Sequence, residues 1–477
     1  MKYPDTLLLI DGNWQPGAQG AWLDVSNPAS EERIGRVAKA EIADLDRALS
    51  AAERGFATWR RIPAFERSKV LRRAADHLRQ RAEEIAYILT LEQGKPLVEA
   101  RAEVFGGADV IDWFAAEAQR AYGRVIPARA TDVAQTVIRE PVGTVVTFTP
   151  WNFPITQLVR KVSAALAAGC SIIAKGPEET PGSPAALIQA FVDAGVPAGA
   201  LNLIYGDPRE ISSHLIPHPT VRKISFTGST PVGKELAALA GRHMKRTTME
   251  LGGHAPVIVC RDADIAIAIE RLVAGKFRNA GQVCIAPTRF LVHASVYDAF
   301  VDGFALAAGA IRVGDGLSPD TQMGPLANVR RLVAMDELVS DAIDQGAILV
   351  AGGHHVGNGG HFYAPTVLKD VPLSARIMND EPFGPVAAMA PFTNLSDAIT
   401  EANRLSFGLA AYAYTRSSAV AHELGQRIES GMLSINHAGL ALPETPAGGV
   451  KESGHGVEGG ADAIDSYLTT KFVTHAV

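Results

Sequence analysis

Cysteine is scarce in this chain, and long apolar runs are missing. Among 477 residues there are three cysteines, Cys170, Cys260 and Cys284. An odd and sparse set argues against a disulfide framework and fits a reducing compartment. The longest uncharged apolar run, residues 162–174, is shorter than the roughly 20 residues of a membrane-spanning helix. Acidic residues near the N-terminus are unlike a signal peptide, so we expect a cytoplasmic protein without a membrane partner.

The chain also lacks a strong excess of charge of either sign. Its 45 Lys and Arg against 51 Asp and Glu give a formal net charge of −6. This balance argues against nucleic acid as a partner. Hydrophobic residues make up 47% and charged residues 20%, as in a globular protein, and two or three domains are expected at this length. We find no internal repeat and no low-complexity tract.

The first 140 residues contain three different patterns. A turn-rich stretch, residues 1–40, predicts an edge hairpin. Residues 122–140 are strand-like, exposed and charged, which predicts a protruding hairpin that contacts another subunit. The strand-like tail, residues 466–477, is a candidate partner for it. Between these patterns, apolar residues at helical spacing predict helices over residues 42–54, 64–81, 83–92 and 97–120.

From residue 141 onward, short β-branched runs alternate with helical segments. Such alternation is typical of parallel βαβ units, so we predict an α/β fold with a doubly wound sheet. A second alternating set begins at residue 255 and predicts a second α/β domain. In the first set the strands are at 142–148, 171–175, 201–205 and 223–227, with helices at 154–169, 184–194 and 232–243.

Cys284 lies on a turn between a predicted helix, residues 264–277, and a predicted strand. Gly281 ends the helical pattern, and Pro287 prevents an immediate return to helix. A free cysteine is more often a small core residue than a nucleophile. Here the turn favours a nucleophile, whereas Cys170 and Cys260 border apolar elements and are expected in the core.

Polar residues follow several predicted strands, where ligands of open α/β sheets lie. Asn152 precedes a helix, so it is either an N-cap or an amide donor to an oxyanion. Lys175 and Glu178 either hold a ribose or form a solvated charged loop. Gly228 and Ser229 open a helix whose free N–H groups would favour a phosphate, although their spacing is not the dinucleotide fingerprint.

Two glutamates complete the candidate set. Glu250 lies between Met249 and Leu251, where desolvation could raise its pKa and make it a general base; a surface glutamate is the alternative. Glu381 and Phe383 stand on a Pro- and Gly-rich frame, and the alternative there is a loop with one packed phenylalanine.

In chain order, these motifs resemble the NAD(P)-dependent aldehyde dehydrogenase superfamily. Within it the chain is most similar to the succinate-semialdehyde and 2-oxoglutarate-semialdehyde dehydrogenases. The resemblance covers essentially the whole chain. It rests on Pro150-Trp151-Asn152-Phe153-Pro154, Lys175 with Glu178, Phe226-Thr227-Gly228-Ser229, Glu250-Leu251-Gly252-Gly253, Gly281-Gln282-Val283-Cys284 and Glu381-Pro382-Phe383-Gly384-Pro385.

The resemblance implies a Rossmann-type cofactor domain, an α/β catalytic domain and a small β oligomerisation hairpin. The cofactor domain would comprise residues 1–121 and 141–252, the catalytic domain residues 253–447, and the oligomerisation segments residues 122–140 and 448–477. A homodimer or homotetramer is implied.

The resemblance also implies residue roles. Cys284 would be the nucleophile, Asn152 with the Cys284 backbone N–H the oxyanion donor, and Glu250 the base for deacylation. Arg160 and Arg278 would bind a substrate carboxylate; alternatively, Arg160 lies on a solvated face with Lys161, and Arg278 ends a helix whose dipole favours a cation. The cofactor residues would be Trp151, Lys175, Glu178, Gly228, Ser229, Glu381 and Phe383, with no metal.

The implied reaction is oxidation of a carboxylate-bearing semialdehyde, of succinate, glutarate or 2-oxoglutarate, to the dicarboxylic acid. NAD is the expected cofactor and NADP a second candidate. One alternative is a CoA-acylating enzyme, in which a thiol rather than water takes the acyl group. Glu250 argues against it, because an enzyme of that kind needs no base to activate water. A non-catalytic structural homologue is another, against which the intact Cys284, Glu250 and Asn152 argue.

Four positions depart from the family pattern. Gly176 replaces the proline that usually follows the ribose lysine and is expected to loosen that turn. His254 replaces asparagine, and Ala447 replaces the phenylalanine of Pro-Phe-Gly-Gly. Leu442 stands roughly where succinate-semialdehyde enzymes have a substrate-binding serine. No second cysteine lies beside Cys284, so no disulfide switch is expected.

Overall fold

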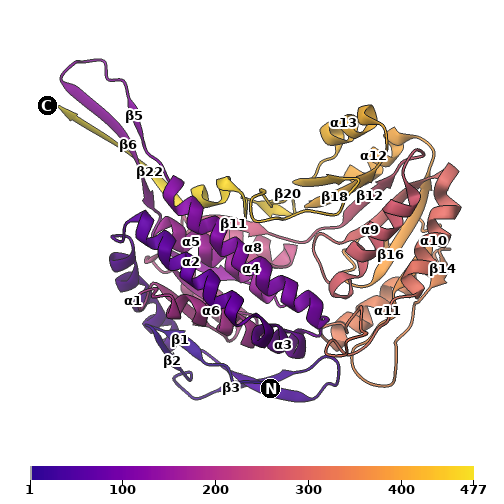
Figure 1. Cartoon of the computed structure of the whole chain (residues 1–477), viewed down its shortest axis with the longest axis horizontal. Coiled ribbons are helices and arrows are strands. Elements are labelled where there is room, and N and C mark those ends of the chain that lie inside the picture. Colours follow the sequence, from indigo (N-terminus) through magenta and orange to yellow (C-terminus); the bar gives the residue numbers. More distant parts are fainter. Residues whose placement is uncertain (1–2, 477) are drawn as a thin grey trace.

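The structure, a computed structural model, describes residues 3–476. It consists of two α/β lobes and a three-stranded arm that projects from one of them (Figure 1). Each lobe has its own hydrophobic core, one built from residues up to 251 and the C-terminal segment, the other from residues 255–447. None of the described helices is both long and apolar enough to cross a membrane.

The first lobe is built on an eight-stranded sheet of order β2-β1-β9-β8-β7-β10-β11-β21. The strands from β9 to β11 are parallel, and β7 and β8 are completely buried, as expected for a sheet covered on both faces. The strands are β1 (Leu8–Ile10), β2 (Asn13–Gln15), β7 (Thr144–Phe148), β8 (Ser171–Lys175), β9 (Leu201–Ile204), β10 (Val221–Thr227), β11 (Arg246–Glu250) and β21 (Gly454–His455).

The strand order of this sheet reverses at β7. Strands β8 and β9 continue on one side of β7, whereas β10 and β11 lie on the other. Such a switch point opens a crevice beyond the carboxyl ends of the strands, where ligands bind. The helices of this lobe are α1 (Ile42–Trp59), α2 (Ala64–Gln80), α3 (Ala82–Gln93), α4 (Leu97–Glu117), α5 (Pro154–Ala168), α6 (Gly182–Asp193), α7 (Pro208–Leu215) and α8 (Thr230–Arg242). A separate hairpin pairs β3 (Trp22–Ser26) with β4 (Arg33–Ala38).

The second lobe is built on a seven-stranded sheet of order β14-β15-β16-β13-β12-β18-β19. All neighbours are parallel except the edge strand β14. The strands are β12 (Ala255–Val259), β13 (Pro287–His293), β14 (Ile348–Ala351), β15 (Thr366–Lys369), β16 (Val386–Phe392), β18 (Ala410–Tyr414) and β19 (Met432–Ile435). The helices are α9 (Ile265–Phe277), α10 (Tyr297–Gly309), α11 (Val329–Asp344), α12 (Leu395–Asn403) and α13 (Ser418–Arg427). The predicted two-domain α/β fold is confirmed.

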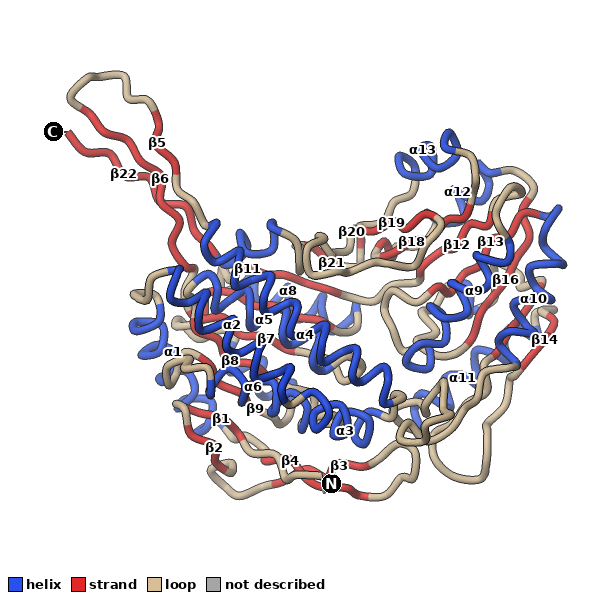
Figure 2. The backbone as a smooth tube through the Cα atoms, viewed as in Figure 1, coloured by secondary structure: helices blue, strands red, loops and turns tan. Residues whose placement is uncertain are grey.

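The arm consists of β5 (Arg124–Ile126), β6 (Val133–Pro141) and β22 (Leu468–Ala476), whose strands leave the lobe together (Figure 2). All nine residues of β22 pair with β6, which confirms the predicted pairing of hairpin and tail; residue 477 lies outside the described residues. Val125 is 80% exposed and Phe472 53% exposed. A subunit contact through this apolar surface stays a prediction.

The C-terminal segment is shared between several parts of the fold. Strand β21 pairs with β11 of the first sheet, and β20 (Val450–Lys451) pairs with β17 (Phe407–Gly408) of the second lobe. Of the strands in this described C-terminal segment, β22 alone belongs to the arm. The domain limits drawn at residues 252, 447 and 448 therefore stay predictions.

Candidate active site

The candidate site residues gather where the edges of the two sheets meet. Asn152 follows β7 and Gly228 follows β10, at the carboxyl ends of the first sheet. Gly253, Cys284 and the segment 381–383 precede β12, β13 and β16, at the amino ends of the second sheet. A cavity of about 550 Å³ lies between these edges, lined among others by Trp151, Asn152, Gly228, Ser229, Gly252, Cys284, Arg331, Glu381 and Phe383.

Cys284 is held on a turn of unusual backbone geometry. After α9, Asn279 has a φ of 50° and Gly281 a φ of 70°, both in the left-handed region. A Cβ on Gly281 would lie 2.2 Å from the Gly384 carbonyl oxygen, and one on Gly253 would lie 2.6 Å from that of Cys284. Sparsely populated backbone conformations of this kind cluster at functional sites. The half-buried thiol thus faces the cavity from a rigid frame.

Asn152 is buried, with 3% exposure, and is not the N-cap of α5, which begins after Phe153. The N-cap alternative is therefore wrong. Its amide Nδ2 donates to the Gln282 carbonyl at 3.0 Å. Its backbone carbonyl accepts from Asn279 Nδ2 at 3.0 Å. The second amide N–H is free of protein partners among the described residues, and the side chain borders the same cavity as Cys284.

Glu250, the last residue of β11, has a pKa well above its ordinary value. Burial is the main cause, and the Glu458 carboxylate adds to it. The Glu250 Oε1 atom is fully buried and lacks a hydrogen-bond partner within residues 3–476. The carboxylate acts electrostatically on Cys284, so the surface alternative is wrong. A carboxyl group whose pKa is raised by burial is a better proton acceptor than an ordinary glutamate once it is ionised.

Beside Glu250 lies a buried ion pair that sequence reasoning missed. Lys161 Nζ contacts Glu458 Oε1 and donates to Thr227 Oγ1 at 2.6 Å, and Ser225 donates to the same Glu458 oxygen at 3.0 Å. Lys161 has no exposed surface, so it is not part of a solvated face. A lysine inside the apolar run of α5 was the available signal, because lysine is almost never fully buried unless paired.

The candidate ribose-binding residues lie at the carboxyl end of β8. Lys175 Nζ forms a 2.7 Å ion pair with Glu178, whose Oε1 accepts from the Gly206 N–H at 3.0 Å. Their side chains are 6% and 22% exposed, which contradicts a solvated charged loop. The pair does not border the cavity at Cys284 but lies along the same sheet edge.

The cavity residues fit a dinucleotide. Ser229 precedes α8 without a side-chain capping bond, so the helix N-terminus presents its N–H groups toward the cavity that Ser229 lines. A Cβ on Gly228 would collide with the Phe226 ring at 2.4 Å, so only glycine leaves the backbone open there. At the other end, the rings of Trp151 and Phe383 meet edge to face at 5.7 Å.

Glu381 faces the cavity from the amino end of β16. Burial raises its pKa to about 7, while the Gly253 N–H, which donates to Oε1 at 3.1 Å, acts in the opposite direction. The second carboxylate oxygen accepts no bond from the described residues, which leaves it available for a ribose hydroxyl.

The two candidate substrate arginines differ in their surroundings. Arg160 is buried and donates to the backbone carbonyls of Glu458, at 3.1 Å, and Ala441. Burial lowers its pKa, and the charges of Glu458, Glu250 and Cys284 act in the opposite direction. Arg278 is exposed and lies over the Phe153 ring, 5.2 Å from its centroid. Its charge reaches Cys284, whose pKa it lowers against the larger effect of burial.

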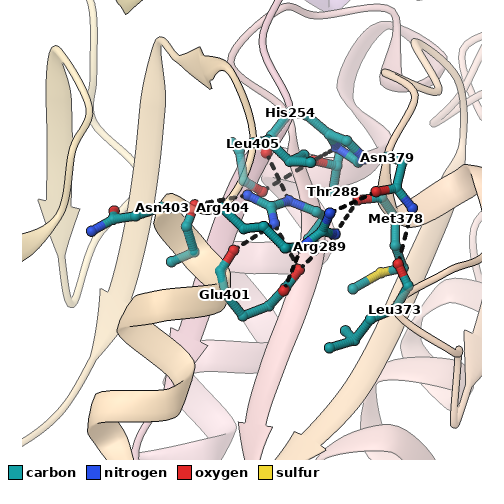
Figure 3. Close-up of polar contacts among 12 residues, drawn as sticks. His254, Thr288, Arg289, Leu373, Met378, Asn379, Glu401, Asn403, Arg404 and Leu405 are labelled. Carbon is teal, nitrogen blue, oxygen red and sulfur yellow. Dashed lines mark hydrogen bonds and ion pairs between the residues drawn. The ribbon is translucent and has the colours of Figure 1, made fainter.

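The family departures have structural reasons. The Tyr205 ring fills the space above Gly176, where a Cβ would lie 2.5 Å from it, and a looser turn at this position stays a prediction. His254 is buried within a polar cluster behind the site, bonded to Thr288 Oγ1 at 2.7 Å and the Ile377 carbonyl at 3.0 Å (Figure 3). Ala447 pairs through its backbone with Glu458, whereas Leu442 is 46% exposed.

Comparison with known proteins agrees with this geometry. The model of the aldehyde dehydrogenase family matches residues 14–473. This chain is an aldehyde dehydrogenase.

Two relatives and one solved structure illustrate the family likeness. A 4-(hydroxymethyl)benzenesulfonate dehydrogenase of Comamonas testosteroni is 49% identical over 466 residues, covering 98% of this chain and 97% of the relative. A succinate-semialdehyde dehydrogenase [NADP(+)] of Escherichia coli strain K12 is 40% identical over 465 residues, covering 98% and 96%. A succinate-semialdehyde dehydrogenase of Burkholderia pseudomallei superposes with a TM-score of 0.97 at 40% identity, covering 99% and 98%. The protein is an NAD(P)-dependent enzyme of this family.

The electrostatics of Cys284 lead to a test of the site. Burial raises the pKa of the thiol to about 12, and the carboxylates of Glu381 and Glu250 add to the rise. In the cofactor-free aldehyde dehydrogenase we expect the iodoacetamide labelling rate to rise about tenfold per pH unit between about pH 7 and 10, following the thiolate fraction. Glu381→Gln should accelerate labelling at pH 8. Cys284→Ala, which keeps the two buried cysteines, serves as the unlabelled control in mass spectrometry. A rate that levels off below about pH 9 would contradict this assignment.

Proposed function

We propose that this aldehyde dehydrogenase oxidises a small aldehyde whose other end carries an anionic group, a carboxylate or a sulfonate. The observation that carries the proposal is that two guanidinium groups, of Arg160 and Arg278, act electrostatically on Cys284 from different elements. Arginine binds planar or tetrahedral oxyanions through several parallel N–H donors. The names of the two relatives, one a semialdehyde enzyme and one a benzenesulfonate enzyme, support an anionic substrate.

The proposed reaction uses the three central residues in turn. The Cys284 thiolate adds to the aldehyde carbon, and the Asn152 amide with the Cys284 backbone N–H stabilises the resulting oxyanion. A bound nicotinamide cofactor would supply the hydride acceptor for this oxidation, and the acyl group would remain on Cys284 as a thioester. Glu250 takes a proton from water, which attacks the thioester and releases the acid. The ion pair of Lys161 and Glu458 lies beside Glu250 and orders the surroundings of this base.

The cofactor would be held along the crevice of the first sheet. Lys175 and Glu178 would hold the adenosine ribose, and the N-terminus of α8 at Ser229 would hold the diphosphate. Glu381 and Phe383 would hold the nicotinamide riboside, against Trp151. A cationic ring bound beside Cys284 would favour the thiolate.

The roles of Cys284 and Glu250 are tested together by Glu250→Gln. A general base typically contributes roughly 10²–10⁴-fold to its own step, so deacylation should slow by about that factor and acylation much less. Rapid mixing should show a burst of NADH followed by a slow steady state. Cys284→Ala should abolish both phases while cofactor binding is kept. Equal loss of burst and steady state in Glu250→Gln would assign Glu250 a structural role, and a steady-state rate restored by CoA would favour the acylating alternative.

Substrate charge is tested with a panel of aldehydes matched in length. We expect succinate, glutarate or 2-oxoglutarate semialdehyde, or a sulfonated aldehyde, to exceed butanal in kcat/KM by at least about 10²-fold, roughly 3 kcal/mol. Each of Arg160→Ala and Arg278→Ala should remove most of that preference, because each deletes one of the two guanidinium groups proposed to bind the anionic group. Arg416→Ala, in an exposed pair with Asp264, is the matched control. Unchanged discrimination in both variants would assign the two arginines structural roles.

Cofactor choice is proposed to rest on Glu178. Its carboxylate, held by Lys175 and the Gly206 N–H, would accept from a ribose 2′-OH and repel a 2′-phosphate. Wild type should therefore have the higher kcat/KM with NAD. Glu178→Ser should shift the NAD/NADP ratio toward NADP by about 10-fold or more, since a repulsion of roughly 1.4 kcal/mol corresponds to that factor. A wild-type preference for NADP would overturn this assignment.

A further inference from the structure

A buried group of three charged residues lies behind the Asn152 turn and outside the cavity. Lys95 connects α3 to α4, while Glu99 and Glu103 lie on α4. Lys95 has 1% and Glu103 6% exposure. None of the three borders the cavity at Cys284, and none belongs to the family motifs recognised in the sequence. An ion pair buried this deeply carries a large desolvation cost. A pair that carries this cost beside the site is expected to have a structural or functional role.

One arm of the group holds the turn that carries Asn152. Lys95 Nζ donates to the Asn152 backbone carbonyl at 2.9 Å and contacts Glu103 Oε2. Glu103 Oε1 accepts from the backbone N–H groups of Ile155 at 3.0 Å and Thr156 at 3.1 Å, in the first turn of α5. The ion pair therefore holds both the Asn152 peptide and the first turn of α5 that follows it.

The other arm holds the turn that leads to Cys284. Glu99 Oε2 accepts from the backbone N–H of Asn279 at 2.9 Å. Asn279, in its left-handed conformation, donates through Nδ2 to the Asn152 carbonyl at 3.0 Å. The Asn152 carbonyl thus receives one donor from each arm. The same cluster joins the oxyanion-donor turn of the first lobe to the nucleophile turn of the second.

We propose that Lys95 and Glu103 are positioning residues for aldehyde oxidation, which fix the Asn152 peptide so that its side-chain amide points at the aldehyde oxygen, where negative charge develops when Cys284 attacks. The inference rests on the proposed oxyanion role of Asn152. The ion pair acts through the backbone of Asn152 and makes no contact with substrate. A displacement of about 1 Å at such a position costs about 10²-fold in rate, which is the scale of effect expected here.

A double-mutant cycle tests the coupling. The variants are Lys95→Met/Glu103→Gln, which removes both charges but keeps an acceptor for α5, Asn152→Ala, and all three substitutions together. The burst rate of NADH formation is measured with saturating cofactor and aldehyde. Asn152→Ala should slow the burst by about 10²–10³-fold. The ion-pair variant should slow it by about 10–100-fold. The triple variant should be within about threefold of Asn152→Ala alone, because Lys95 and Glu103 act only through Asn152.

Cofactor dissociation constants and thermal midpoints are measured on the same variants. The ion-pair variant should bind cofactor within about threefold of wild type. Lys69→Met/Glu66→Gln, which removes an exposed ion pair of 2.9 Å on α2, is the matched control and should leave the burst unchanged. If the ion-pair variant does not fold, Glu103→Gln alone carries the same cycle.

The possible results separate the two hypotheses. Losses that multiply in the triple variant, or a loss of cofactor affinity as large as the loss of burst rate, would overturn the positioning role. A normal burst in Asn152→Ala would instead overturn the oxyanion role of Asn152 and the inference with it. A normal burst in the ion-pair variant, with a slow one in Asn152→Ala, would overturn the inference alone.

Discussion

The site depends on backbone segments of the second lobe that touch without side chains between them. Gly253 lies against the Cys284 carbonyl and Gly281 against the Gly384 carbonyl, at separations that no Cβ could occupy. These contacts hold together three segments at the amino edge of the second sheet, and Asn152, at the carboxyl edge of the first, bonds to the Gln282 carbonyl among them. Glycine is required because a larger residue at either position would push these segments apart.

Carboxylates near Cys284 and Glu250 shift the pKa values of both groups. The carboxylates of Glu250 and Glu381 both raise the pKa of Cys284, after burial, and Glu458 raises that of Glu250. The cofactor-free protein therefore holds its Cys284 thiol largely protonated near neutral pH, and the pKa of Glu250 is raised in the same direction. The proposed binding of a cationic nicotinamide ring, and of an anionic substrate tail by arginine, would complement this arrangement, because each would place its charge near groups of opposite sign.

Buried polar clusters link the site to the rest of the fold. Lys161 with Glu458 joins α5 to the C-terminal segment beside the base, and Lys95 with Glu103 joins α4 to the Asn152 turn. Arg289 with Glu401 holds β13 against α12, behind His254. Each pair carries a desolvation cost, and each connects elements distant in sequence. Their shared effect is to restrict the positions of turns that packing of apolar residues alone would leave adjustable.

Sequence periodicity was sufficient for most helices and strands, for the alternating α/β pattern and for the motif residues, because these depend on local spacing and on turn residues. It missed α7 and α13, which are short, and β11, β15, β16 and β19; β16 is alanine-rich and β11 carries charged ends, so neither has a strong strand pattern. Three features were decided by tertiary structure alone. The second sheet contributes its amino edge to the site, and Tyr205 fills the space at Gly176. Lys95 and Lys161 are buried in ion pairs with carboxylates. These contacts cannot be predicted from sequence spacing, because their partners lie on separate elements whose distance is set by packing.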